Sequence, residues 1–250
     1  MISDIILIGP LKAGKSTLAK LLSRRLKVPQ YSLDKHRHYY KEAGFDEAYA
    51  RELIRKDGFS ALYHYRKPFE AFIVERILAQ HSNCVFDFGA CHSVYEDDAL
   101  FERVRRILQP YRNVVLILPA PDLEESIQIL RGRGSVTRIG EVDLCEHFVR
   151  HNSNFDLAKS IVYTKGKTPE ITCNEILALL PPPAGCPGGD AGVGDAKSRN
   201  SLYGAPQRNN VKEVLTNLLS GPLPSGNEGV PGAKHPDPGN PPQLRHQPAS

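Results

Sequence analysis

The sequence offers little from which to build disulfides, a cysteine metal site or a membrane anchor. No apolar run approaches the roughly 20 residues that a membrane-spanning helix needs. No C-x-x-C pair and no metal-site spacing occurs among the five cysteines, which are Cys84, Cys91, Cys145, Cys173 and Cys186. An odd, scattered set is typical of reduced thiols, so we expect a cytoplasmic protein. The few residues before the first apolar run predict no signal peptide and no membrane as partner.

A strong charge of either sign is also missing. The formal net charge of the chain is +4, and residues 1–180 carry 26 basic and 23 acidic side chains, a net charge of +3. Domains that bind nucleic acid normally concentrate positive charge on one surface. The sequence therefore predicts no nucleic acid as partner.

Large apolar residues become scarce after residue 180. Residues 181–250 hold 13 of the 20 prolines and 11 of the 20 glycines. Such a segment cannot bury enough apolar surface to offset a cost of about 1–2 kcal/mol for ordering each residue's backbone. We expect one domain over 1–180 and a disordered tail over 181–250. Apolar residues at helical spacing predict a short tail helix over 208–219, which can dock on a protein partner or on the domain.

The first 180 residues alternate apolar stretches with helical patterns. This alternation is typical of an α/β fold, in which helices cover a parallel sheet. The predicted strands lie at 5–8, 30–34, 83–90, 113–118 and 160–164. One long segment, residues 35–81, is predicted to be a mostly helical insertion, broken at Gly44 and Gly58 and interrupted near Pro68.

The stretch from Gly9 to Ser16 has the spacing G-x-x-x-x-G-K-[ST] of a phosphate-binding P-loop. It lies between a predicted strand and a predicted helix, as that mechanism requires. Gly9 and Gly14 permit backbone conformations that bring main-chain N–H groups close to an anion. Lys15 is expected to reach the β- and γ-phosphates, and the Ser16 hydroxyl to ligate Mg²⁺. An ordinary βα turn is the alternative interpretation.

Two aspartates stand at the carboxyl ends of predicted strands, where ligands of open parallel sheets bind. Asp34 ends the second strand, and Asp87 follows the apolar run of the third. Asp87 has the position of an acid that helps to hold Mg²⁺. Gly89 and Ala90 would let the backbone approach a ligand. A helix-capping role is the alternative for both aspartates, evenly balanced for Asp34 and disfavoured for Asp87.

Arginines gather in two further places. Residues 131–140 interleave three arginines with three glycines, which predicts a mobile flap, followed by one helix over 143–159 that carries Arg150. An arginine over a transferring phosphoryl group stabilises its developing charge; a basic surface loop is the alternative. The insertion is rich in arginine and tyrosine, which in a cleft can hold a hydroxylated or acidic substrate. Solvated helix faces are the simpler interpretation of any single residue there.

The opening from Leu7 to Ala19, the aspartate after the second strand and the arginine segment resemble the shikimate kinase-like branch of the P-loop small-molecule and nucleoside monophosphate kinases. The likeness covers residues 1–180. It implies a P-loop NTPase three-layer sandwich with a five-stranded parallel sheet, a helical insertion and an arginine lid. It also implies ATP and Mg²⁺ as cofactors and a small-molecule substrate.

The resemblance assigns roles to individual residues. Catalytic roles fall to Lys15, Asp34 and Arg133, and metal binding to Ser16 and Asp87. Nucleotide binding is implied for Gly9, Pro10, Leu11, Lys12, Ala13, Gly14, Lys15, Ser16, Thr17, Arg131 and Arg150. Substrate binding is implied for Asp34, Arg66, Gly89, Ala90 and Arg138.

Two features depart from shikimate kinases. That family has three glycines after the third strand, where this chain has Phe88-Gly89-Ala90. It also has an arginine three residues before a glutamate in the substrate helix, whereas Arg66 and Glu70 are four apart. Asp87-Phe88-Gly89 is instead similar to the Asp-Gly of nucleoside monophosphate kinases.

The leading hypothesis is an ATP- and Mg²⁺-dependent phosphotransferase acting on a small hydroxylated metabolite. A nucleoside or nucleotide kinase is the first alternative. The second is an ATP-binding regulatory module without acceptor turnover, suggested by the missing glycines.

Overall fold

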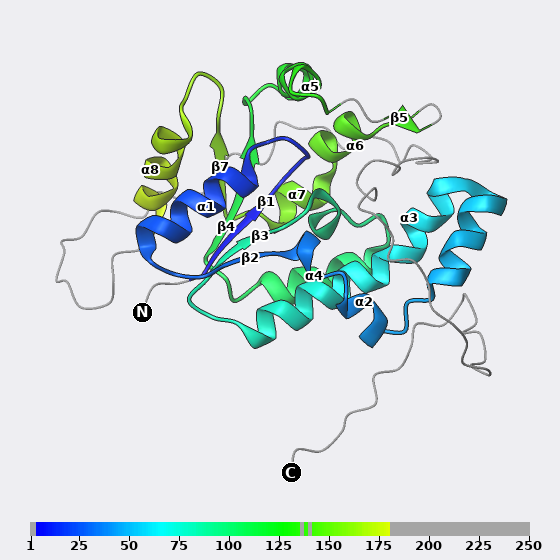
Figure 1. The fold of residues 1–250 in the computed structure, drawn as a ribbon. Helices are drawn as coiled ribbons and strands as arrows, with labels where there is room; N and C mark the ends of the chain where they lie inside the picture. Colours follow the sequence, from blue (N-terminus) through cyan, green and yellow to red (C-terminus); the bar gives the residue numbers. More distant parts are fainter. Residues whose placement is uncertain (1–3, 136–137, 140–141, 181–250) are drawn as a thin grey trace, which may run out of the picture.

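The computed structural model describes residues 4–135, 138–139 and 142–180 of the 250-residue chain. Its centre is a five-stranded sheet, drawn in Figure 1, with the strand order β2-β3-β1-β4-β7. The strands are β1 (Ile5–Ile8), β2 (Gln30–Ser32), β3 (Val85–Asp87), β4 (Asn113–Leu118) and β7 (Ser160–Tyr163). Every pairing in this sheet is parallel. The predicted five-stranded parallel α/β sheet is therefore confirmed.

The central strands are apolar on both faces because helices cover both. All four residues of β1 and all six of β4 are buried, as expected for strands inside a parallel sheet. The helices are α1 (Lys15–Leu26), α2 (Tyr39–Glu42), α3 (Glu47–Gln80), α4 (Asp98–Leu108), α5 (Leu123–Gly132), α6 (Leu144–Arg150), α7 (Asn152–Leu157) and α8 (Pro169–Leu179). Two turns of 3₁₀ helix, η1 (Leu33–Lys35) and η2 (Ala90–Ser93), follow β2 and β3.

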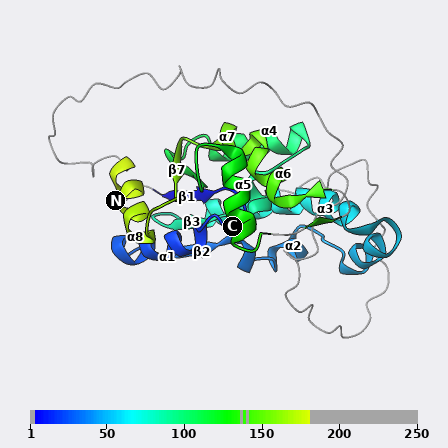
Figure 2. The same ribbon diagram turned by 90° about the horizontal axis from the view of Figure 1, so that it is seen from above.

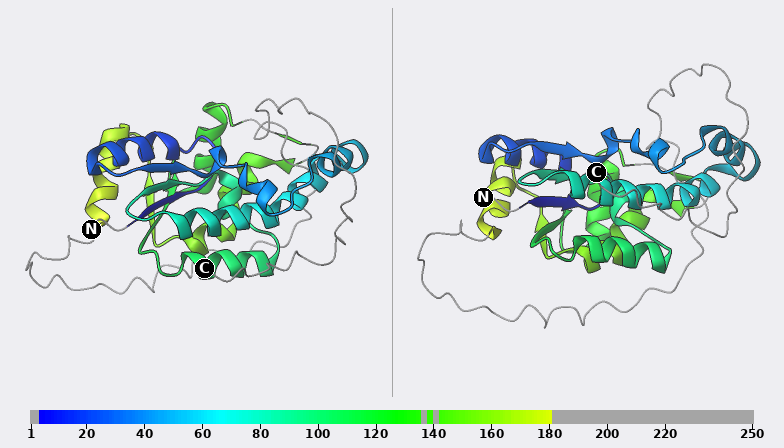
Figure 3. Two further views of the ribbon diagram at one scale, coloured as in Figure 1. Left: turned by 60° about the horizontal axis from the view of Figure 1, so that its bottom comes forward. Right: turned by 90° about the horizontal axis from the view of Figure 1, so that it is seen from below.

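Two apolar cores make the molecule three layers deep. One face of the sheet packs against α1, α5, α6 and α8, with Leu22, Ile127 and Ile176 in that core. The opposite face packs against α3, α4 and α7, with Ile73, Val104 and Leu157 in its core. Figures 2 and 3 show these helix layers on either side of the sheet. The expected three-layer sandwich is therefore present.

Three expectations about helix boundaries were wrong. The insertion helix α3 runs through Pro68 without interruption, whereas the predicted break at Gly58 is present, with φ of +77°. A single helix over 143–159 is replaced by α6 and α7, because His151 has extended backbone and its side chain accepts a hydrogen bond from the Ser153 amide. The helix expected to stop at Leu130 continues to Gly132, so Arg131 is helical.

The carboxyl ends of β1, β2 and β3 lie side by side, since these strands are neighbours in one parallel sheet. The loops that follow them carry the P-loop, Asp34 and Gly89. A small antiparallel hairpin, β5 (Arg138–Ile139) with β6 (Val142–Asp143), connects α5 to α6. The tail over 181–250 and its expected helix over 208–219 lie outside the described residues. Within the described part, none of the helices has the length and apolar character to span a bilayer.

Candidate active site

The loop between β1 and α1 has the backbone that a phosphate cradle needs. Gly9 and Gly14 have φ values of +127° and +102°, in the left-handed range that disfavours other residues. A Cβ at Gly9 would also lie 2.6 Å from the Ile117 carbonyl oxygen. No side chain caps the start of α1, so its first amide groups are free to donate to an anion.

Lys15 folds back over this loop. Its Nζ donates to the carbonyl oxygens of Gly9, at 2.8 Å, and Pro10, at 2.7 Å, and the side chain is buried. Burial lowers the pKa of Lys15, and the nearby carboxylates of Asp87 and Asp34 oppose that change. The ammonium group therefore sits among these acids at the mouth of the cradle, within a short side-chain rotation of an anion bound there.

Asp87 ends β3 beside the first turn of α1. It is buried, and burial raises its pKa, against the opposing effects of a hydrogen bond with Ser16 and the Lys15 charge. A carboxylate and a hydroxyl in contact are oxygen ligands of the kind that Mg²⁺ prefers. Asp87 and Ser16 thus fit a magnesium ion, which would share ligands with the phosphates of a nucleotide.

Because the pKa of Asp87 is raised in the folded protein, its charge opposes folding at neutral pH. Asp87→Asn is expected to raise the free energy of unfolding at pH 7 by about 0.5–2 kcal/mol. The gain should shrink as the pH falls through the raised pKa of Asp87 toward the ordinary carboxyl pKa, below which Asp87 is protonated in both states. Urea unfolding at pH 7 and pH 4 measures this. Asp57→Asn, at an exposed site on α3, should change neither value, and a destabilised Asp87→Asn would contradict the expectation.

A cavity of about 310 Å³ brings these groups together with the second strand end. It is lined by Leu11, Lys12, Gly14, Lys15, Ser16, Thr17, Asp34, Asp87, Phe88, Gly89 and Ala90. The structure therefore places P-loop residues, both predicted aspartates and the small residues after β3 around one space. The P-loop residues Pro10 and Ala13 are buried behind it.

The Asp34 carboxylate packs directly against Gly89 in the loop after β3. It lies in η1, and a Cβ built on Gly89 would be 2.3 Å from its Oδ1 and 2.6 Å from its Oδ2. Only a residue without a side chain leaves this carboxylate where it is. This position of Asp34 thus requires glycine at residue 89.

Sequence reasoning did not single out His92, which lies in η2 beside Asp34. Its side chain is 4% exposed, and its Nδ1 is 3.9 Å from Asp34 Oδ1. Neither ring nitrogen has a hydrogen-bond partner among the described residues. The apolar neighbours Cys91 and Val94 give no hint in the sequence that this histidine faces a carboxylate.

A buried ion pair that the sequence did not reveal fixes the loop after β3. Lys67 on α3 lies 3.1 Å from Glu70 and donates to the carbonyl oxygens of Cys91 and Val94 at 3.1 and 2.8 Å. Burial alone would lower the pKa of Lys67, but the Glu70 charge helps to raise it overall. The insertion thereby holds the segment that carries Gly89 and Ala90.

The arginines proposed for a lid have separate surroundings. Arg133, which caps the end of α5, donates from Nη1 to the Lys12 carbonyl oxygen of the P-loop at 3.3 Å. Arg131 instead bonds Asp143, with its Nη2 and Nε at 2.6 and 2.9 Å from Oδ2. Arg138 belongs to β5.

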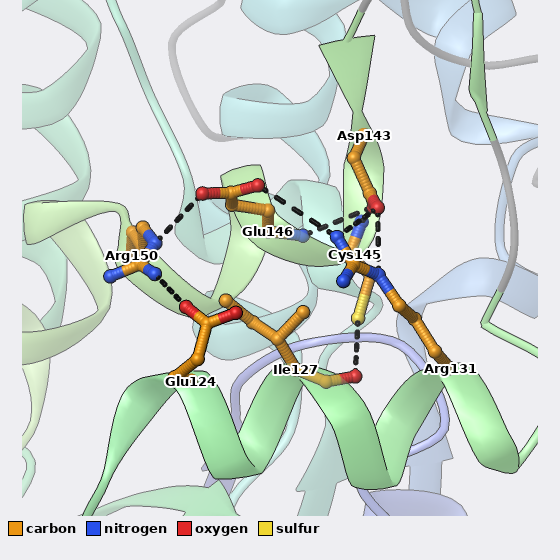
Figure 4. Close-up of polar contacts among 7 residues, drawn as sticks. All are labelled: Glu124, Ile127, Arg131, Asp143, Cys145, Glu146 and Arg150. Atoms are coloured by element: carbon orange, nitrogen blue, oxygen red, sulfur yellow. Dashed lines mark hydrogen bonds and ion pairs between the residues drawn. The ribbon is translucent and has the colours of Figure 1, made fainter.

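Figure 4 shows that Arg131 and Arg150 belong to one ion-pair network between α5 and α6. Arg150 lies 3.0 Å from Glu146 and also pairs with Glu124, while Arg131 is 3.8 Å from Glu146. Neither arginine lines the cavity. In this conformation they join the two helices at the base of the β5–β6 hairpin.

Arg66, predicted to bind substrate, does not line the cavity either. It lies over the rings of Tyr40 and Phe45, 5.9 and 5.7 Å from their centroids. Its Nε and Nη1 are buried without a hydrogen-bond partner among the described residues, and burial lowers the pKa of the guanidinium. Both nitrogens are enclosed, so a ligand would reach them only after neighbouring side chains move.

No family model matches the sequence, and comparison with curated proteins gives no match either. Solved structures that are similar include shikimate kinase from Acinetobacter baumannii in complex with shikimate. That alignment has 18% identity, covers 72% of this chain and 93% of that one, and has a TM-score of 0.48. For shikimate kinase from Aquifex aeolicus the values are 20%, 70%, 95% and 0.45. For a gluconokinase from Sinorhizobium meliloti 1021 they are 13%, 71%, 90% and 0.39.

Proposed function

We propose that this chain is an ATP- and Mg²⁺-dependent phosphotransferase whose acceptor is a hydroxyl group of a small metabolite. The observation that carries the proposal is the shared cavity. It is lined by a phosphate loop with its lysine and also by a carboxylate that can take a hydroxyl proton, Asp34. Phosphoryl transfer requires mainly positioning and charge stabilisation, and this arrangement supplies both.

Each side chain then has a role that its surroundings permit. The P-loop amides and Lys15 bind the phosphates, and Ser16 and Asp87 hold Mg²⁺, which neutralises charge on the phosphates when bound. Asp34 orients the acceptor hydroxyl and accepts its proton. Arg133, already in contact with the P-loop, closes over the transferring group and stabilises its charge.

The substrate half of the proposal rests on three further sites. Gly89 and Ala90 present backbone to the acceptor beside Asp34, and Arg66, whose two unpartnered donors are buried, would bind an anionic or hydroxylated end of the acceptor once neighbouring side chains move. Arg131 and Arg150 would join the nucleotide only if their ion pairs with acidic residues open, and Arg138 on β5 is assigned to the acceptor. Thr17, Lys12 and Leu11 line the nucleotide side.

An acceptor panel tests the proposal. The full-length protein is incubated with MgATP and with cyclic polyols, sugar acids or nucleosides, and ADP formation is followed. Acceptor-dependent ADP with a polyol or sugar acid supports the proposal, and a response confined to nucleosides selects a nucleoside kinase. Tight MgATP binding without turnover of any acceptor selects a regulatory module, and the absence of MgATP binding contradicts all three.

Gly89→Ala is expected to impair turnover of the acceptor without changing nucleotide binding. The added methyl group must displace the Asp34 carboxylate, and Gly89, with φ of −62°, otherwise tolerates a side chain. A misplacement of about 1 Å can cost roughly 10²-fold in rate, so we expect kcat/KM for the acceptor to fall about 10–100-fold. ADP affinity should stay within about twofold.

Gly132→Ala is the matched control, because a Cβ there meets nothing within 4 Å. It should leave acceptor turnover unchanged. Unaltered turnover in Gly89→Ala would contradict the assigned contact between Gly89 and Asp34.

We further propose that residues 1–180 form the catalytic unit. Both apolar cores and every residue of the cavity lie within this range. A protein ending at residue 180 is expected to keep its MgATP affinity and acceptor kcat within about twofold. A loss of more than tenfold in a folded truncation would assign the tail a part in catalysis.

A further inference from the structure

A second cluster of chemically active side chains lies outside the cavity. Glu96, in the loop after η2, meets His147 on α6 and His151 at the junction of α6 and α7. One ligand atom from each residue lies within 4.8 Å of the other two. None of these residues has a part in the proposed phosphoryl transfer.

Hydrogen bonds hold the Glu96 carboxylate through one of its oxygens and leave the other oxygen without a partner among the described residues. Its Oε1 accepts hydrogen bonds from the Tyr63 hydroxyl at 2.5 Å and from His147 Nε2 at 2.9 Å. Its Oε2 is buried and has no hydrogen-bond partner among the described residues. A buried carboxylate oxygen without a partner is costly, so the geometry indicates a partner that is absent here.

Two histidines supply nitrogen ligands from the same side. His147 and His151 are four residues apart, and the His151 amide donates to the His147 carbonyl oxygen at 3.0 Å, which keeps helical register. Their ring centroids are 5.1 Å apart. Side chains at this spacing share one face of a helix, as in helical metal sites with two histidines.

The distances suit a small transition metal after modest side-chain rotation. Two ligands at about 2.1 Å from a tetrahedral zinc ion lie about 3.4 Å from each other, compared with 2.9 Å between His147 Nε2 and Glu96 Oε1. The site is sheltered, since the His147 and Glu96 side chains are 9% and 20% exposed. Lys67, whose charge acts on both Glu96 and His151, is itself paired with Glu70.

We propose that Glu96, His147 and His151 bind a divalent transition-metal ion, with Zn²⁺ the best match. Two imidazoles and one carboxylate are a recurrent zinc ligand set that leaves a position open. The Tyr63 hydroxyl orients the carboxylate from behind, as the outer contacts of metal sites commonly do. The bound ion would fasten the start of the α6–α7 segment to the loop after β3.

Binding changes hydrogen bonds at both histidines. Ligation through His147 Nε2 moves the proton of that nitrogen to Nδ1, so metal–ligand bonds replace the hydrogen bond to Glu96 Oε1. His151 Nδ1 now accepts from the Ser153 amide at 3.2 Å, so its other nitrogen carries the proton in the neutral ring. Ligation through Nε2 moves that proton to Nδ1 and releases the Ser153 amide. The metal thereby links the Glu96 site to the first turn of α7.

A bound ion would also restrain the β5–β6 hairpin. α6 begins at Leu144, directly after β6, so an ion held by His147 lies one turn from the end of the hairpin. Restraining this turn restrains the base of the segment that joins Arg133 to α6. This inference stands without the proposed kinase activity, because it depends on the three ligands alone.

Cobalt and zinc titrations of the chelator-treated full-length protein test the site. We expect one Co²⁺ per chain with visible d–d absorption, displaced by Zn²⁺, with a Kd of about 1 μM or tighter. His147→Gln and His151→Gln should each weaken binding at least about tenfold. His38→Gln, an exposed histidine on another element, should leave binding unchanged, which excludes ligands elsewhere in the chain.

A second measurement needs no variant. In ¹⁵N-histidine spectra of the wild-type protein, Zn²⁺ should shift the ring nitrogens of two histidines and the backbone amide of Ser153. Wild-type protein without stoichiometric Co²⁺ or Zn²⁺ binding would overturn the proposal. So would binding that persists with equal affinity in folded His147→Gln and His151→Gln proteins, since those results assign the metal to other residues.

Discussion

Replacing Lys15 with alanine is expected to reduce kcat/KM for MgATP by about 10²–10³-fold or more. The buried ammonium group lines the cavity and lies against the phosphate loop, and the amides of that loop cannot replace its charge on the β- and γ-phosphates. Its loss therefore weakens both nucleotide binding and the stabilisation of the transferring group. Calorimetric titration with MgATP and initial rates with saturating acceptor measure the two effects.

The same variant should remain folded. Lys15 is a buried cation whose pKa burial lowers, so the ammonium group contributes little net stability. We expect the thermal midpoint of Lys15→Ala to lie within a few degrees of the wild type. Lys20→Ala, an exposed lysine one turn further along α1, is the matched control and should bind MgATP normally. Wild-type affinity in Lys15→Ala would contradict the phosphate-loop assignment.

Replacing Asp34 with asparagine is expected to lower kcat by about 10²–10⁴-fold, the usual range for a general base. Asparagine keeps the size and one acceptor oxygen, but it cannot take the proton of the acceptor hydroxyl. Because Asp34 comes from η1 and not from the phosphate loop, MgADP affinity should change by less than about threefold. This combination distinguishes a catalytic carboxylate from one that has only a structural part.

Asp57→Asn makes the same chemical change on the exposed face of α3 and should leave kcat unchanged. A kcat within about threefold of the wild type would show that another group accepts the proton. In that case His92, 3.9 Å from Asp34, is the nearest replacement.

The phosphate loop and the sheet could be predicted because their signals are local. The spacing from Gly9 to Ser16 fixes the loop, and short apolar runs mark buried strands whatever surrounds them. Asp34 and Asp87 could be placed at one edge because parallel strands end together. Gly89 follows β3, so the same parallel arrangement brings it to the edge where both aspartates lie.

The sequence could not predict which arginine contacts the P-loop and which one pairs with an acidic residue. Arg131 and Arg133 are two residues apart, and their different surroundings follow from where α5 ends. Arg131 meets Asp143, which the hairpin returns to it. A sequence pattern does not reveal such a partner, because the partner depends on the path of the intervening chain.

The cluster around Glu96 could not be predicted either, because its residues are far apart in the sequence. Glu96 and His147 are 51 residues apart, and Tyr63 comes from the insertion. The four-residue spacing of His147 and His151 was the one local signal available. A helix over these residues places both rings on one face, but it does not reveal that Glu96 lies opposite them.

Phosphorus NMR of the wild-type protein with MgATP and the acceptor panel tests the central claim most directly. Transfer to a hydroxyl predicts loss of the γ-phosphate resonance and growth of a new phosphomonoester resonance, with one ADP formed for each ester. The same sample with Lys15→Ala should show neither change. A spectrum in which ATP stays intact with every acceptor, or yields only inorganic phosphate, would contradict the proposed phosphotransferase.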